Sequence, residues 1–70
     1  MAAHSVAKVI EISSSSPKSF EDAIQSGIKK VSKSVKNIGG AWVKEQKVRT
    51  SADGKVTQWR VVMRISFVVE

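Results

Sequence analysis

The fold of this chain is decided by residues 17–40, which read PKSFEDAIQSGIKKVSKSVKNIGG. Apolar side chains recur in this stretch at steps of three and four residues, the spacing that places them along one side of an α-helix. The stripe consists of Phe20, Ile24, Ile28, Val31, Val35 and Ile38, with Ala23 and Gly27 beside it. We therefore predict one amphipathic helix that buries this stripe.

Both ends of the predicted helix carry local signals. Pro17 suits the first turn, where its missing N–H costs nothing, and either Ser16 or Ser19 is a suitable N-cap. With Ser19 as the cap, Asp22 occupies the third helical position of a capping box. The stop is predicted at residues 37–40, where two glycines follow Asn-Ile.

Three stretches around the helix alternate apolar and polar residues, which predicts β-strands. They are residues 5–12, 41–50 and 56–69. The serines at 13–16 are predicted to form the loop before the helix, and Asp53-Gly54 is a strong hairpin signal. The order predicts a single α+β domain over residues 1–70, a β-α-β-β subunit with a three-stranded antiparallel sheet wrapped on one helix.

The last strand has one apolar face and one mixed face. Its odd positions are all apolar, and we expect them to pack on the helix: Trp59, Val61, Met63, Ile65, Phe67 and Val69. The even positions mix arginine, glutamine and serine with valine, so one helix leaves this second face and the sheet edges uncovered. A chain of 70 residues without cysteine also lacks a disulfide to stabilise a small core. Both arguments predict that identical subunits cover the sheet.

The register of the hairpin has two interpretations. A two-residue turn at Asp53-Gly54 would place Lys44 and Gln46 on the helix side of the sheet. A bulge or longer loop around residues 50–54 would reverse this. In that arrangement, which we prefer, the mixed face receives Trp42, Lys44 and Gln46, and the buried face receives Ala41 and Val43.

The net charge of +6 is compatible with a basic binding surface or simply with solubility. The lysines of the helix are predicted to be solvated, because the chain has no RNP-type aromatic pair, KH glycine loop or zinc knuckle, which argues against nucleic acid. No apolar run is long enough to span a bilayer, and residues 1–6 lack a signal-peptide pattern. We expect a cytoplasmic protein without a membrane partner.

Catalysis and metal binding lack their usual residues in this sequence. His4 is the only histidine, and no nucleophile–base pair is recognisable. The carboxylates show no local pairing, so a calcium site would have to be assembled between subunits. We predict that the chain is not an enzyme and has no metal site of its own.

Five segments, in order and over nearly the whole chain, resemble the dodecin family. They read VIEI (9–12), SPKSFEDAI (16–24), VKNI (35–38), DGKV (53–56) and VVMRISFVVE (61–70). The resemblance implies a hollow homododecamer that binds flavin, as FMN or riboflavin, between subunits, for storage and sequestration. It also implies a tryptophan in the second strand that stacks on the flavin ring and a glutamine in the third strand that bonds its polar edge.

The residues at those two positions differ here. Gly40 occupies the position of the stacking tryptophan, with Trp42 two residues later, and Arg60 occupies that of the glutamine, with Gln58 two residues earlier. A two-residue step keeps a side chain on the same strand face, so the predicted ligand-binding residues are Trp42, Gln58 and Arg60. Because some relatives of this kind are associated with calcium, the alternative is a flavin-free shell with a structural or calcium-binding role.

Trp42 and the arginines of the last strand also have a structural interpretation. Trp42 is either a stacking platform or an anchor between subunits. Arg60 and Arg64 either hold a phosphate or carboxylate or form inter-subunit ion pairs. The acidic partners for such pairs would be Glu11, Glu45 or Glu70.

Overall fold

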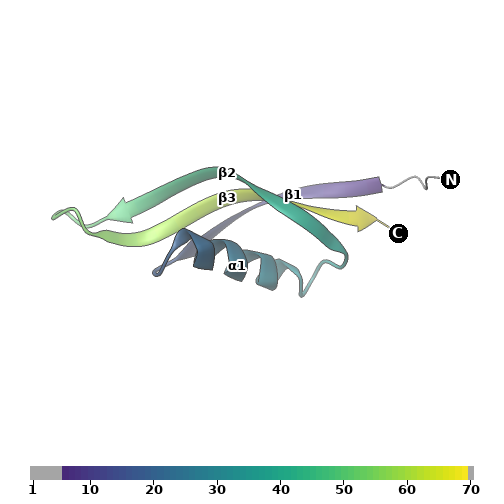
Figure 1. Cartoon of the computed structure of the whole chain (residues 1–70), viewed down its shortest axis with the longest axis horizontal. Helices are drawn as coiled ribbons and strands as arrows, with labels where there is room; N and C mark the ends of the chain where they lie inside the picture. Colours follow the sequence, from purple (N-terminus) through teal and green to yellow (C-terminus); the bar gives the residue numbers. More distant parts are fainter. Residues whose placement is uncertain (1–5, 70) are drawn as a thin grey trace.

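The computed structural model describes residues 6–69 and has the predicted β-α-β-β order. The elements are β1 (Val6–Ser16), α1 (Phe20–Val31), β2 (Ile38–Thr50) and β3 (Val56–Val69). The antiparallel sheet has the order β1-β3-β2, with α1 packed against β1 and β3 (Figure 1). Three positions named above lie outside the described residues: Ser5, where the first strand was predicted to start, His4 and Glu70.

The helix begins where a serine cap predicts it. The side chain of Ser19 accepts the backbone N–H of Asp22 at 3.0 Å, which confirms Ser19 as the N-cap. The Asp22 carboxylate instead accepts the hydroxyl of Ser16, at 2.6 Å, and the Ser16 oxygen in turn accepts the N–H of Lys18, at 2.9 Å. The buried Ser16 is therefore fully bonded and ties the end of β1 to the start of α1.

The serine run was predicted to be a loop, and this prediction is wrong. Residues 13–16 continue β1, paired with Val62, Val61, Arg60 and Trp59 of β3. Ser14 and Ser16 face the helix, and the Ser14 hydroxyl donates to the Ala23 carbonyl at 2.7 Å. Serine suits this strand because α1 approaches it closely, leaving space for a small side chain with a bonding partner.

The helix is shorter than predicted, because it ends at Val31 rather than at residues 37–40. Ser32 caps it, with its N–H on the Ile28 carbonyl at 2.9 Å. Asn37 then adopts a left-handed backbone (φ 63°), and its carbonyl accepts the N–H of Val68 at 3.0 Å. Ile38 continues the helical spacing of apolar residues but belongs to β2, where it pairs with Phe67. The strand was predicted to begin only at residue 41.

The core lies between α1 and the odd positions of β3. Val61, Met63 and Ile65 are fully buried, as is Ala23 on the helix. A Cβ on Gly27 would lie 2.7 Å from the Met63 methyl carbon and 2.9 Å from the Ser14 Cβ, so only glycine allows this approach of helix to sheet. Trp59 lies on the same face of β3 but is only half-buried.

The hairpin follows the predicted longer-loop register, with one difference. Residues 51–55 form the loop, with Gly54 at φ 88°, and Trp42 lies opposite Arg64 on the mixed face. A further bulge between Val43 and Glu45 reverses the alternation, so Gln46 lies opposite Val61 on the helix side. The predicted mixed-face position of Gln46 is therefore wrong.

The predicted burial of Ala41 and Val43 is not seen in the subunit. Both side chains face the helix side, opposite Ile65 and Met63, yet all of β2 beyond Ile38 is exposed. The radius of gyration is 14.9 Å, against about 11 Å for a compact domain of this length. The single chain is an elongated body, and its hairpin extends away from the helix (Figure 1).

Candidate functional site

The side chains that point away from α1 form what we call the outer face of the sheet. In antiparallel strands, directly opposed residues lie on the same face. The even positions of β3 therefore share this face with their partners on β1 and β2. The outer face includes Trp42, Gln58 and Arg60, the three residues that the sequence analysis selected.

Trp42 lies at one end of the outer face and is 48% exposed. It is opposite Arg64, whose Nε donates to Glu11 Oε1 at 3.1 Å. Lys44 Nζ lies 3.3 Å from the same oxygen. Arg64 therefore pairs within its own subunit, and Trp42 lies beside a cluster with one carboxylate and two cations.

The carboxyl group of Glu11 responds to these contacts. The hydrogen bond from Arg64, then that from Lys44 and its positive charge, lower the pKa of Glu11 below the ordinary value of 4.5. Glu11 is therefore ionised at neutral pH, and the cations beside Trp42 are already neutralised in part.

Gln58 and Arg60 lie at the opposite end of the outer face. Gln58 is six residues along β3 from Arg64, the partner of Trp42, which corresponds to about 20 Å of strand. For Arg60 the separation is about 13 Å. One chain therefore brings Gln58 and Arg60 together but does not bring Trp42 to them.

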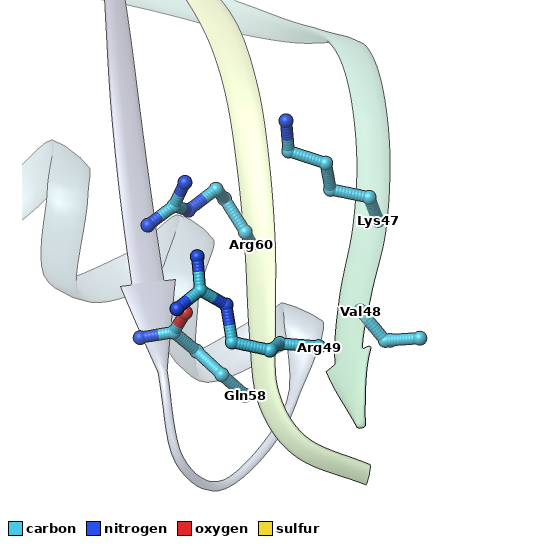
Figure 2. Close-up of a pocket in the computed structure, with 5 residues that line it drawn as sticks. All are labelled: Lys47, Val48, Arg49, Gln58 and Arg60. Carbon is cyan, nitrogen blue, oxygen red and sulfur yellow. The ribbon is translucent and has the colours of Figure 1, made fainter. Parts of the chain in front are cut away.

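A cavity of about 210 Å³ lies at this second end, between β2 and β3. It is lined by Lys47, Val48, Arg49, Gln58 and Arg60. Figure 2 shows the head groups of Arg49, Gln58 and Arg60 on one side of β3, and Val48 directed away from them. We call the four polar lining residues, Lys47, Arg49, Gln58 and Arg60, the basic cluster.

Lys47 and Arg49 are not among the site residues predicted from the sequence. In a regular strand they would lie on the face opposite to Trp42, five and seven residues away. The bulge after Val43 brings them to the outer face, where they pair with Arg60 and Gln58. One sequence signal was available, because Val43 and Val48 are five residues apart, an odd spacing that a regular strand would place on opposite faces.

The position of Gly40 is open in the subunit. Gly40 lies on the outer face opposite Ser66, whose hydroxyl donates to its carbonyl at 3.3 Å. A Cβ built there would meet no heavy atom within 4 Å. Trp42 is two residues, about 7 Å, further along the same face, so the tryptophan is displaced along the strand and not turned to the other side.

Residues 6–69 contain no cluster of three or more acidic, histidine or cysteine side chains that could hold a metal ion. Within the same range, no helix is long and apolar enough to cross a membrane. A second cavity, of about 290 Å³, lies between β1 and α1, and its lining combines four serines and Gly27 with Lys30 and the apolar Ile12 and Val31.

Comparisons with known proteins agree on one family. The sequence model described as Dodecin matches residues 6–70. A search of curated proteins finds no match. Among solved structures, a dodecin from Streptomyces davaonensis is similar with a TM-score of 0.89 and 26% identity, covering 97% of this chain and 98% of that one.

Two further similar structures have a lower and a higher sequence identity than this one. A dodecin from Streptomyces coelicolor has a TM-score of 0.90 at 20% identity, covering 99% and 97% of the two chains, and supports the fold alone. A calcium-chelating antigen of Mycobacterium tuberculosis, called calcium dodecin and described with a novel calcium-binding site, has 34% identity and a TM-score of 0.79. That match covers 93% of this chain and 91% of the other.

Proposed function

The chain belongs to the dodecin family, and we propose that it binds and sequesters a flavin, FMN or riboflavin, without catalysing a reaction. The binding sites lie between subunits of a hollow homododecamer in the cytoplasm. Trp42 stacks on the isoalloxazine ring, and Gln58 and Arg60 reach polar atoms of the ligand. Stacking of this kind quenches the excited flavin and limits its photochemistry.

One observation carries the proposal: a large aromatic side chain is exposed on a face that the subunit cannot cover. Trp42 is 48% exposed, and tryptophan offers a large, flat surface to a ring. The outer face also carries polar groups about 20 Å away along the strands, on the same side as Trp42. Placing these two ends against each other requires a second copy, which the extended shape of the chain also favours.

The test is a titration of the purified protein with riboflavin and with FMN, followed by flavin fluorescence. We expect saturable quenching, and we expect Trp42→Ala to weaken the affinity about 5- to 150-fold, since base–aromatic stacking contributes about 1–3 kcal/mol. Trp59→Phe is the matched control, because Trp59 lies on the other face of the sheet. No quenching by the unmodified protein at stoichiometric concentration would reject flavin binding.

A gain-of-function variant tests the displaced position directly. Gly40→Trp restores the residue type that the family resemblance places at this position. The open space beside Gly40 accepts the larger side chain within the subunit. We expect tighter flavin binding in this variant than in the unmodified protein, because it adds an aromatic platform at the family position and keeps Arg60.

The second candidate function is a flavin-free shell with a structural or calcium-binding role. It is favoured by Gly40 and Arg60 at the usual contact positions and by the calcium dodecin at 34% identity. The carboxylates that calcium needs would have to come from several subunits. This function predicts colourless protein and a melting temperature that rises with calcium and falls with a chelator. A melting temperature that is unchanged by both rejects the calcium role.

A further inference from the structure

Four exposed lysines lie at the C-terminal end of α1 and in the turn that follows it. They are Lys29, Lys30, Lys33 and Lys36, and we call them the lysine surface. The backbone keeps helical hydrogen bonds past the end of α1, since the N–H groups of Ser34 and Val35 both donate to the Val31 carbonyl at 2.9 Å. The four lysines therefore follow one another on successive turns, on the exposed side of the helix.

The lysine surface has no acidic neighbours. Within residues 6–69, none of its ammonium groups forms an ion pair, and from Ala23 to Lys44 the sequence has no acidic residue. The acidic residues of α1, Glu21 and Asp22, lie in its first turn, about 10 Å or more from the first of these lysines along the helix axis. This separation exceeds the Debye length of about 8 Å at physiological salt, so the positive charges are not compensated locally.

Two structural roles do not account for the whole surface. Lysines in the last turn complement the helix dipole, which explains Lys29 and Lys30, but Lys33 and Lys36 lie beyond the end of α1. Solubility requires charge but not its segregation, and ordinary surfaces mix both signs. From the sequence these lysines were expected only to be solvated. The structure shows in addition that they share one side of the helix without an acid among them.

The spacing of these lysines suits a row of phosphates. Lys29 and Lys36 are seven residues apart, which in helical geometry corresponds to about 10 Å. One strand of a nucleic-acid duplex carries a phosphate about every 3.4 Å along its axis, so about three phosphates occupy that length. Lysine is a point charge on a flexible stem, and such a charge can follow phosphates without a fixed geometry.

The exposed side of α1 offers no group that would read bases or insert into lipid. The lysine surface contains neither arginine nor an aromatic side chain. The apolar side of the helix is occupied, because Ile24 and Ile28 pack against the buried core, whereas a helix that binds a lipid surface needs its apolar side free. Contacts to phosphates alone position a duplex without reading its sequence, which agrees with the absence of base-reading motifs in this chain.

We propose that the lysine surface binds the phosphodiester backbone of a nucleic-acid duplex, without sequence preference. This interaction goes beyond flavin binding and uses the side of the subunit opposite to the outer face. In the proposed dodecamer every copy carries the same four lysines. A long duplex then contacts several copies and is bound more tightly than by one copy.

The test titrates a short fluorescein-labelled duplex with the assembled protein and follows fluorescence anisotropy at several salt concentrations. For three or four phosphate contacts on one copy, we expect the affinity to fall about 40- to 150-fold as salt rises from about 50 to about 200 mM. Two duplexes of unrelated sequence should bind equally. A DNA duplex and an RNA duplex distinguish the two sources of this backbone, and binding to either supports the inference.

Two double variants separate the lysine surface from the net charge. Lys33→Gln with Lys36→Gln should reduce the slope of log affinity against log salt by about two. Lys18→Gln with Lys55→Gln removes the same charge at exposed positions elsewhere and should retain the slope. None of these four side chains is buried, so both variants should fold and assemble, which circular dichroism and light scattering check.

Vesicles that contain phosphatidylserine test the competing anionic partner by co-sedimentation. Vesicle binding without duplex binding would assign the surface to a membrane and overturn the inference. It is equally overturned if no duplex binds at low salt, if the two double variants lose the same slope, or if the protein prefers one of the unrelated sequences. None of these results depends on flavin binding, which the quenching titration measures separately.

Discussion

Met63 on β3 and Val48 on β2 both point to the helix side of the sheet, yet Met63 is fully buried and Val48 is 45% exposed. The difference comes from α1, which packs on β1 and β3. We call β1, α1 and β3 the helix-covered part of the subunit. In that part, one chain supplies both sides of the core. The apolar side chains of β2, in contrast, are not covered by the helix of the same chain.

This contrast separates a region that is buried within one subunit from a region that is not. The helix-covered part needs no partner to bury Val61, Met63 and Ile65. The side chains of Val43 and Val48 on β2 are 36% and 45% exposed, so their burial depends on another molecule. In the proposed dodecamer, substitutions in the two regions should differ in their dependence on protein concentration.

The largest effect is expected for Met63→Ala in the helix-covered part. Removing a fully buried methionine side chain leaves a cavity and should lower the free energy of unfolding by about 2–5 kcal/mol. Chemical unfolding followed by circular dichroism measures the change, with the volume-conserving Met63→Leu as the control. A loss below about 1 kcal/mol for Met63→Ala would contradict a core centred on this residue.

The next effect is expected for Gly27→Val. The close contacts of a Cβ at Gly27 with Met63 and Ser14 predict a cost of about 1–3 kcal/mol from overpacking. This exceeds the gain from removing glycine from a helix, which is about 0.5 kcal/mol or less here because valine is itself a poorer helix former than alanine. The same unfolding assay checks it, with Ser26→Val, at an exposed position of α1, as the control. Stabilisation by Gly27→Val would show that the helix can move away from the sheet.

A smaller effect, of another kind, is expected for Val48→Ala on β2. Its cost should be about 1 kcal/mol or less, because the side chain is already half-exposed in the subunit. That cost should grow with protein concentration as assembly buries β2, while the cost of Met63→Ala should not. Unfolding at two concentrations, with light scattering of the assembly, compares them. Equal concentration dependence for both variants would remove the distinction between the regions.

The smallest effect is expected for the pH dependence that Glu11 contributes. Because its pKa in the folded chain lies below 4.5, the unfolded chain binds more protons in that interval, and stability falls as pH drops through it. Glu11→Gln should flatten the decrease in melting temperature between about pH 5 and about pH 3. Glu21→Gln, at an exposed helix position, is the control and should retain the wild-type slope.

Several features were predicted correctly because their causes lie within a few residues. The cap at Ser19, one of the two candidates, the Asp53-Gly54 turn and the strand at 56–69 each follow from local hydrogen bonding or from unbroken alternation. The shared face of Trp42, Gln58 and Arg60 followed from the two-residue period of a strand. Their binding role stays a prediction.

The errors have causes that lie far apart in the sequence. Helical spacing continues to Ile38, but the Asn37 carbonyl bonds to Val68 and draws this segment into the sheet. Serines 13–16 have weak strand preference, yet β3 provides partners for all of them and α1 leaves space only for small side chains. Neither contact is visible in the local pattern.

The sequence by itself determined the order of the elements, the apolar face of β3 and the start of the helix, because alternation, helical spacing and capping act between near neighbours. Only the tertiary structure decided where α1 stops, how far β1 extends and which side chains of β2 reach the outer face. The last of these depends on one bulge after Val43, whose position is set by pairing with β3. That bulge turns Lys47 and Arg49 towards Arg60 and so creates the basic cluster.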